Sequence, residues 1–198
     1  MGAIAIQQKA TYPLTVVPKQ PPISWEAFER KYLTREDLFK YEWVNGLIEK
    51  TPRSMSQEQQ YLYINLSDFL TDLRFAGKAS GRLLAEVDTF FSDRIHRRPN
   101  IAYFSDEQRK LMADGVNQVP KFIVEVISTN DQINRVHKKM RNYRDAEVAV
   151  VWHIFPLLEE IHVYNGLTMT VCSGEMLCSA EPVIPHFKLS VNQIFKKN

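Results

Sequence analysis

The sequence has few of the features that would place it at once in a specialised class of protein. It contains only two cysteines in 198 residues, and no cysteine or histidine spacing that resembles a zinc site. No apolar run approaches the roughly 18 residues that a membrane span needs, and the N-terminus lacks the basic and then apolar segments of a secretory signal. The formal net charge is only +2, so there is no overall signature of nucleic-acid binding. We therefore expect a cytoplasmic protein that does not span a membrane, with any basic surface confined to local clusters.

Length and composition favour one ordinary globular domain. A chain of 198 residues can bury a substantial core without disulfides or a structural metal. Its hydrophobic content of 44% and charged content of 24% are typical of globular proteins. Residues 1–22 are rich in proline and lack an amphipathic pattern, so we expect an extended N-terminal arm. We expect residues 23–198 to form a single α/β domain.

The two cysteines, Cys172 and Cys178, flank a predicted turn at residues 173–175. They could face each other across a hairpin. The alternative is that both are small apolar residues in a reducing compartment.

Local signals predict the elements of the N-terminal part. Ser24 can cap a helix over residues 25–33, and a second short helical segment is expected after Thr34. Residues 41–50 predict a β-hairpin, because Asn45-Gly46 tolerates the positive φ angles of a type I′ turn. A long helix with an apolar stripe is expected over residues 57–75, ended by Gly77.

The remaining part of the chain is rich in β-strand patterns. Strands are expected at residues 82–91, 101–104, 122–127 and 148–155, a closing hairpin at 160–164 and 169–172 around Asn165-Gly166, and a short helix at 191–197. A capping box at residues 129–132 predicts a helix to about Asp145. This order predicts one mixed β-sheet covered by helices, with residues 122–155 forming a right-handed parallel crossover.

Glu125 is the most informative single residue. It lies within Phe122-Ile123-Val124-Glu125-Val126-Ile127, an otherwise apolar strand. A carboxylate is costly to bury there without a partner or a metal. The alternative is that Glu125 lies at a strand end, where it reaches water or pairs with a lysine.

Lys139 is the second candidate. On the helix that follows the Glu125 strand, it borders the apolar stripe that includes Val136 and Tyr143. A lysine near a carboxylate can position a water and stabilise negative charge that develops on phosphate. The alternative is a lysine that extends from the edge of the core to solvent.

The third candidate segment is Arg97-Arg98-Pro99-Asn100-Ile101-Ala102-Tyr103-Phe104. Pro99 favours an extended backbone before the strand, and Asn100 begins the strand. An asparagine at this position is usually a turn or cap residue.

Four segments, in this order, resemble the putative restriction endonuclease family of the PD-(D/E)XK nuclease superfamily, which is abundant in cyanobacteria. They are Tyr41-Glu42-Trp43-Val44-Asn45-Gly46, Arg98-Pro99-Asn100-Ile101-Ala102-Tyr103, Phe122-Ile123-Val124-Glu125-Val126-Ile127-Ser128, and Lys139-Met140-Arg141-Asn142-Tyr143 leading to residues 148–152. The resemblance runs from about Trp25 to Pro185. It implies a restriction-endonuclease-like fold, in which helices flank a mixed β-sheet.

The resemblance also implies a site that uses Mg²⁺ or Mn²⁺ to hydrolyse DNA phosphodiester bonds. In the family pattern, Glu125 would bind the metal together with the backbone carbonyl of Val126. The residue that begins the preceding strand, here Asn100, would be a further ligand.

Two other residues match family positions. A lysine normally stands two residues after the glutamate, where this chain has Ile127, and in this family a lysine on the next helix, here Lys139, would replace it. Glu42 matches a carboxylate of the early hairpin that would contact the metal through water.

The chain departs from the family pattern at Asn100, where relatives have aspartate. An amide offers one neutral oxygen and no charge, so the metal should bind more weakly and activate its water less. Glu86 or Asp88, on the preceding strand, could compensate if either points into the site.

Two basic segments flank the predicted site. One includes Arg97 and Arg98, and the other includes Lys138 and Arg141. These side chains could contact DNA phosphates. The alternative for the helical pair is a solvated helix face.

Three hypotheses for the function follow. The first is a metal-dependent DNA endonuclease, impaired by Asn100. The second is a catalytically inactive domain on the same fold that binds nucleic acid or another protein. The third is a structural oligomer. We expect a homo-oligomer, with a dimer favoured.

Overall fold

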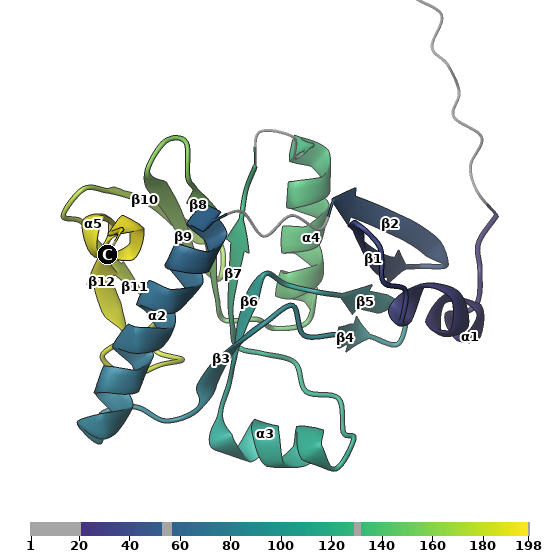
Figure 1. Cartoon of the computed structure of the whole chain (residues 1–198), viewed down its shortest axis with the longest axis horizontal. Helices are drawn as coiled ribbons and strands as arrows, with labels where there is room; N and C mark the ends of the chain where they lie inside the picture. The colour runs from purple at the N-terminus through teal and green to yellow at the C-terminus, as the bar shows by residue number, and fades with distance from the viewer. Residues whose placement is uncertain (1–20, 53–56, 129–131, 198) are drawn as a thin grey trace, which may run out of the picture.

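A computed structural model gives the fold of the chain and describes residues 21–52, 57–128 and 132–197. A six-stranded mixed sheet forms its centre, with helices on both faces (Figure 1). In order across the sheet, its strands are β10 (Thr168–Ser173), β9 (Glu160–Asn165), β8 (Val150–Phe155), β7 (Phe122–Val126), β6 (Ile101–Phe104) and β3 (Arg82–Ala85). Strands β7 and β8 run parallel, and the other neighbouring pairs run antiparallel. A mixed sheet covered by helices is confirmed, but the described residues form three sheets where a single one was predicted.

The two faces of the sheet have different partners. The long helix α2 (Gln57–Phe75), which has the predicted bounds, packs its leucines against alternate residues of β7, including Phe122 and Val124. Helix α4 (Ile133–Asp145) packs on the other face, where Met140 and Tyr143 meet Ile123. Since side chains alternate along a strand, Glu125 shares the α4 face with Ile123.

A smaller sheet lies beside the central one, at the right of Figure 1. Its strands, in order, are β2 (Leu47–Pro52), β1 (Phe39–Val44), β5 (Ile95–Arg97) and β4 (Thr89–Ser92). The predicted Asn45-Gly46 turn joins β1 and β2, with φ angles of 51° and 82°. The outer face of the sheet is covered by α1 (Trp25–Phe28) and the π-helical turn η1 (Glu29–Leu33), through a core of Phe28, Tyr41 and Trp43.

The alternation of side chains along β1 directs two charged residues toward α4. Tyr41 and Trp43 face α1, so Lys40 and Glu42 point to the opposite side of the strand, toward α4. The same short strand therefore supplies a hydrophobic core on one side and charged groups on the other.

The C-terminal part closes the α2 side of the molecule. Strands β11 (Leu177–Ser179) and β12 (Lys188–Ser190) form a two-stranded sheet, and α5 (Val191–Phe195) follows directly. The Asn65 amide on α2 donates to the carbonyls of Ile194 and Lys196, at 2.9 and 2.8 Å. No helix among the described residues combines the length and hydropathy needed to cross a membrane.

Several predicted details of the N-terminal half are wrong. No helix follows Thr34 within residues 34–38, and the predicted strand 82–91 splits into β3 and β4 because the chain turns at Glu86, which has a φ of 50°. The helix α3 (Asp106–Ala113) was not predicted, although its capping box is present in the sequence. Ser105 Oγ accepts from the Gln108 N–H at 3.2 Å, and the Gln108 side chain accepts from the Ser105 N–H at 3.1 Å.

Three further predictions concern the C-terminal half: the start of α4, the β9–β10 turn and the two cysteines. The capping box predicted at residues 129–132 falls mostly outside the described residues, and Gln132, which precedes α4, makes no side-chain cap hydrogen bond. The predicted hairpin of β9 and β10 is confirmed, and its turn is Gly166-Leu167, because Asn165 pairs with Thr168. Both cysteines are buried and free. Burial, and then the neighbouring Cys172, raise the pKa of the Cys178 thiol, so the two side chains do lie beside each other, although β11 pairs with β12 and not with β10.

Candidate active site

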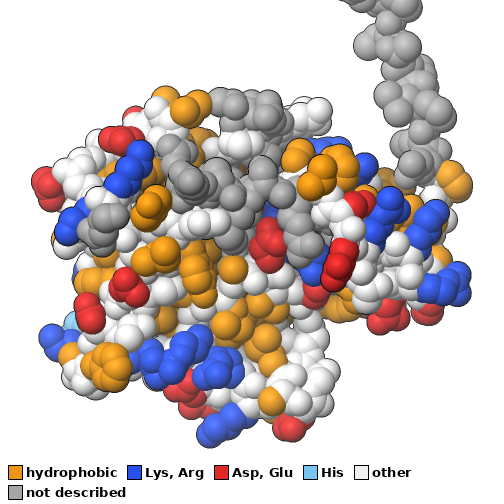
Figure 2. All heavy atoms as spheres, viewed as in Figure 1, with side chains coloured by type: hydrophobic (Ala, Val, Ile, Leu, Met, Phe, Trp, Pro, Cys, Tyr) orange, Lys and Arg blue, Asp and Glu red, His pale blue; other side chains and the backbone are white. Residues whose placement is uncertain are grey.

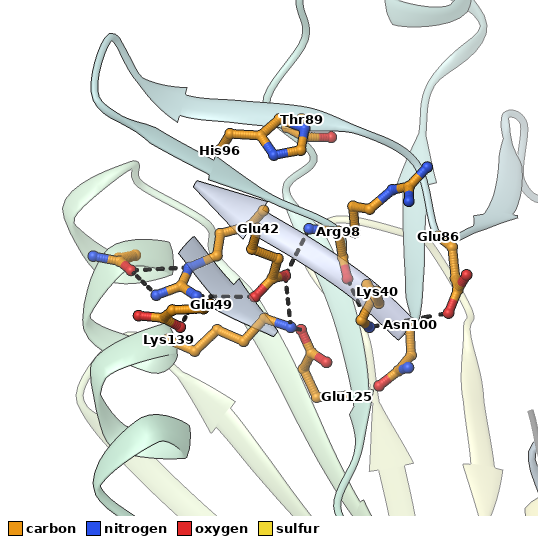
Figure 3. Close-up of polar contacts among 12 residues, drawn as sticks. Lys40, Glu42, Glu49, Glu86, Thr89, His96, Arg98, Asn100, Glu125 and Lys139 are labelled. Carbon is orange, nitrogen blue, oxygen red and sulfur yellow. Dashed lines mark hydrogen bonds and ion pairs between the residues drawn. The ribbon is translucent and has the colours of Figure 1, made fainter. Parts of the chain in front are cut away.

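A pocket of about 240 Å³ lies between the small sheet, α4 and the ends of β6 and β7. Its lining includes the four residues whose side chains were predicted to act in catalysis or metal binding: Glu42, Asn100, Glu125 and Lys139. They come from β1, the start of β6, the end of β7 and α4, which are separated along the chain. Figure 3 shows the four side chains converging.

Lys139 connects the two carboxylates. Its Nζ lies 2.8 Å from Glu125 Oε1 and 3.2 Å from Glu42 Oε1. Burial opposes the charge of the ammonium, but Glu125 and Glu42 raise the pKa of Lys139 above its usual value. The lysine therefore stays charged at neutral pH and holds both carboxylates at the pocket.

Tyr143, one turn further along α4, makes a second contact to Glu125. Its hydroxyl donates a short hydrogen bond to Glu125 Oε1. Burial, and then the charge of Glu125, raise the pKa of Tyr143 well above its usual value, so the hydroxyl keeps its proton. The buried carboxylate in the apolar strand thus has two donors, which offset the cost of its burial.

Arg97 corrects one expectation from the sequence. We predicted a DNA contact, but this residue is 0% exposed. Its Nη1 lies 2.9 Å from Glu42 Oε2 and 2.5 Å from Glu49 Oε2, and its Nε and Nη2 donate to Asn142 Oδ1 at 3.2 and 2.7 Å. With its guanidinium enclosed by these acceptors, Arg97 joins the small sheet to α4 and cannot meet a phosphate at the surface.

The positive charges around Glu42 keep its carboxyl group ionised. Burial alone would raise the pKa of this carboxyl, but the charges of Lys139 and Arg97 hold it well below its usual range. The backbone N–H of Arg98 also donates to Glu42 Oε1 at 2.7 Å. Glu42 is therefore a fixed negative charge that positions the lysine and the arginine.

Asn100 is oriented by the backbone of β7. Its Oδ1 accepts from the Val126 N–H at 3.0 Å, and because that donor is a backbone amide, it fixes which end of the carboxamide is oxygen. An aspartate could accept this bond with one oxygen and present the second to the pocket. Asparagine instead has the Nδ2 donor as its second polar atom.

Two other lining residues, Lys40 and His153, were not among the site residues predicted from the sequence. Lys40 is 7% exposed, and its Nζ donates to the Arg98 carbonyl at 3.1 Å. His153 stands opposite Glu125 in the parallel register of β7 and β8, and burial lowers its pKa to about 4. Strand alternation could have found both, since Lys40 is two residues before Glu42 and a histidine interrupts an apolar strand.

The other predicted basic residues differ in their placement. Arg98 pairs with Asp88, with its Nε 2.7 Å from Oδ1 and its Nη2 2.9 Å from Oδ2. Neither residue lines the pocket. Lys138 is exposed and pairs with Glu49 at 3.0 Å, and Arg141 is exposed on α4. On the described part of the face in Figure 2, basic and acidic side chains are interspersed, with no extended field of one sign.

Of the two carboxylates that could compensate for Asn100, the structure places one at the pocket. Glu86 is a lining residue, and one of its oxygens lies 4.0 Å from Lys40 Nζ. Asp88 is turned away, since it binds His96 and Arg98.

These contacts decide how a divalent cation would fit. Mg²⁺ takes oxygen ligands, usually one or two carboxylates together with waters. Asn100 adds no charge and Glu125 Oε1 already has two donors. Among the described residues no three histidine, cysteine or acidic side chains are grouped to hold a metal. The residues fit a cation bound through one carboxylate, Glu125, with the Val126 carbonyl beside it, and such a site would bind the cation more weakly than one with aspartate at position 100.

Comparisons with known proteins agree with this fold. Residues 25–192 match the model of the family Uma2, described as "Putative restriction endonuclease". A similar solved structure is that of a putative nuclease belonging to DUF820 from Anabaena variabilis, with 18% sequence identity and a TM-score of 0.69, covering 88% of this chain and 98% of that one. At this identity the likeness shows the fold, and it confirms the predicted nuclease-like fold. No curated protein matches the chain.

Proposed function

Since the chain belongs to the Uma2 family of putative restriction endonucleases, we propose that it hydrolyses DNA phosphodiester bonds with the help of Mg²⁺ or Mn²⁺. The observation that carries the proposal is the convergence of Glu42, Glu125 and Lys139 on one pocket. Family membership supports a nuclease-like function, and the metal and the substrate are our proposal.

Each residue has a distinct task in this proposal. Glu125, with the Val126 carbonyl, would hold the cation, which when bound lowers the pKa of water and neutralises charge on phosphate. Lys139 lies beside Glu125, where its ammonium stabilises negative charge on the phosphate oxygens during attack by water. Glu42 keeps Lys139 charged and in place. Hydrolysis then joins the water oxygen to phosphorus, breaks one P–O ester bond and leaves a proton on the departing oxygen.

The test is cleavage of supercoiled plasmid DNA in Mg²⁺ or Mn²⁺, measured as conversion to nicked and linear forms. The wild-type protein should cleave, EDTA should stop the reaction, and Glu125→Ala should abolish it. Glu107→Ala, which removes an exposed carboxylate on α3, is the matched control and should retain the wild-type rate. Cleavage that survives Glu125→Ala in a folded protein would show that the active site lies elsewhere.

A second function is favoured by one observation, the occupation of the site by internal contacts. Asn100 Oδ1 is bound by the Val126 N–H, and Glu125 Oε1 by Lys139 and Tyr143. The alternative proposal is therefore a catalytically inactive nucleic-acid-binding or protein-interaction domain on the same fold. It predicts no cleavage with either metal ion. A domain that binds nucleic acid would still bind DNA, and one that binds protein would not.

A further inference from the structure

Lys40 differs from Arg97 and Lys139 in how far its ammonium lies from a carboxylate partner. Arg97 and Lys139 each lie within 3.2 Å of two carboxylates. The Lys40 Nζ lies 4.0 Å from its carboxylate partner, Glu86 Oε1. Its hydrogen bond goes to a neutral group, the Arg98 carbonyl. A buried ammonium with so distant a counter-charge is costly unless an anion joins it.

The electrostatics agree with the geometry. Burial, and then the nearby charge of Lys139, lower the pKa of Lys40, and the charges of Glu125, Glu42 and Glu86 offset only part of this effect. The pKa of Lys139, by contrast, is raised by its two carboxylates. An anion bound beside Lys40 would remove this imbalance. An ammonium has three donors, so the bond to the Arg98 carbonyl leaves donors for a ligand.

The charges that line the pocket also balance without a metal. Among the described lining residues, four carboxylates face four basic groups: Glu42, Glu49, Glu86 and Glu125 with Lys40, Arg97, Lys139 and Arg135. An aspartate at position 100 would add a negative charge that a divalent cation could neutralise. With Asn100 there is no such excess, and the pocket has an amide donor instead of an acceptor.

From these observations we infer that Lys40 is a phosphate-binding residue, and that with Lys139 it holds a DNA phosphodiester in this pocket without a divalent cation. The inference rests on the proposed function in taking DNA as the ligand. It differs in assigning phosphate binding to Lys40 and in separating that binding from the metal. The Lys40 ammonium donates to a non-bridging phosphate oxygen, and no bond is made or broken in this step.

A purely structural Lys40 would have a different signature. Its loss would change the free energy of unfolding, but not the dependence of DNA affinity on salt. Each phosphate contact releases condensed counterions, so the slope of log affinity against log salt counts such contacts. The salt slope is therefore the readout that separates binding from structural support.

The experiment measures binding of a short labelled DNA duplex by fluorescence anisotropy, in EDTA and over a series of salt concentrations. Wild-type protein should bind in EDTA. Lys40→Met should weaken binding by about tenfold or more and reduce the salt slope by about one. Lys110→Met, which removes an exposed lysine on α3, should leave both unchanged.

Each other outcome has a definite meaning. If wild-type protein binds and cleaves DNA only with Mg²⁺ or Mn²⁺, the inference is overturned while the proposed function stands. If it neither binds nor cleaves DNA in any condition, both fall. If Lys40→Met binds as wild type with the same slope, Lys40 is not a phosphate ligand.

A second measurement covers the case in which Lys40→Met does not fold. The side-chain ammonium resonances of wild-type protein, labelled with ¹⁵N at lysine, are followed during titration with the same duplex in EDTA. The Lys40 signal is assigned with Lys40→Arg. It should shift together with that of Lys139, and a binding isotherm reported by other lysines with no change at Lys40 would overturn the inference.

Discussion

At the scale of single residues, Asn100 is the position where one substitution should change the charge of the pocket most directly. Its Oδ1 is already the acceptor for the Val126 N–H, so a change to aspartate adds an oxygen where the amide now has a donor. The change is nearly isosteric and keeps the backbone contact. It therefore alters the charge of the pocket with little effect on its shape.

We predict that Asn100→Asp binds Mg²⁺ and Mn²⁺ more tightly than wild type, by roughly tenfold, because a second carboxylate is added to the ligand set. Isothermal titration calorimetry on both proteins measures the difference, and plasmid cleavage should increase with it. Asn165→Asp adds the same charge at an exposed strand end and should not change metal affinity. Equal affinity for wild type and Asn100→Asp would contradict the role given to position 100.

His153 should make the folded protein less stable as the pH falls below neutral. Burial lowers its pKa from 6.5 to about 4 in the folded protein. As pH falls, the unfolded chain takes up the proton first, so the free energy of unfolding is unaffected above pH 6.5 and decreases as pH falls toward 4. Between pH 7.5 and pH 5 the loss from this group should be about 2 kcal/mol.

Urea unfolding at these two pH values checks this prediction. His153→Phe, which cannot be protonated, should lose about 2 kcal/mol less than wild type over the same interval. His186→Asn, at an exposed position, should lose as much as wild type. A His153→Phe protein with the wild-type pH dependence would show that this histidine is not held neutral by burial.

At the scale of the elements, β3 is fixed at its start by Gly81. This residue has a φ of 72°, and a Cβ there would lie 2.5 Å from the Phe104 carbonyl oxygen and 2.6 Å from the Tyr103 ring. Gly77, at the end of α2, has a similar φ of 68°, but a Cβ there would meet nothing within 4 Å. Substitution of each glycine by alanine therefore separates two costs: that of the backbone conformation alone at Gly77, and that of the conformation together with a steric clash at Gly81.

We predict that Gly77→Ala lowers the free energy of unfolding by about 1 kcal/mol, the cost of a left-handed alanine. Gly81→Ala should cost at least about 2 kcal/mol more, because β3 must also move away from β6. Urea unfolding of the two variants gives the comparison. Equal losses would mean that the start of β3 adjusts freely.

The elements also show what the sequence could reveal. The Asn45-Gly46 hairpin and α2 were predicted because their signals are local. The strand at residues 82–91 was predicted as continuous because nothing local marks Glu86 as a turn, and its positive φ is imposed by the fold. The residues of the site divide in the same way, into those that local patterns reveal and those that depend on distant segments. Glu125 and Lys139 were found because they interrupt apolar patterns, whereas the burial of Arg97 depends on acceptors from three distant segments.

At the scale of the whole molecule, the pocket is also the junction of the two sheets. Lys138 and Lys139 of α4, which packs on the central sheet, pair with Glu49 and Glu42 of the small sheet. Arg97 adds its bonds to Asn142 of α4. Ion pairs that are largely buried are costly to break singly. The two sheets should therefore unfold together as long as this network is intact.

The three tryptophans allow this coupling to be measured. Trp25 and Trp43 lie at the core of the small sheet, and Trp152 lies in the core of the central sheet. In a Trp152→Phe protein, fluorescence reports the small sheet, while far-ultraviolet circular dichroism reports the whole chain. We predict that the two urea transitions coincide, as in two-state unfolding.

Lys139→Met, made in the same background, should separate the transitions, because it leaves Glu42 and Glu125 without their shared cation. The fluorescence transition should then occur at lower urea, since the small sheet is held by fewer contacts and has the smaller core. Lys110→Met, which removes an exposed lysine outside the network, should keep the transitions coincident. If they coincide after Lys139→Met as well, the apolar contacts between the sheets are sufficient to couple them, and the ion pairs serve the pocket alone.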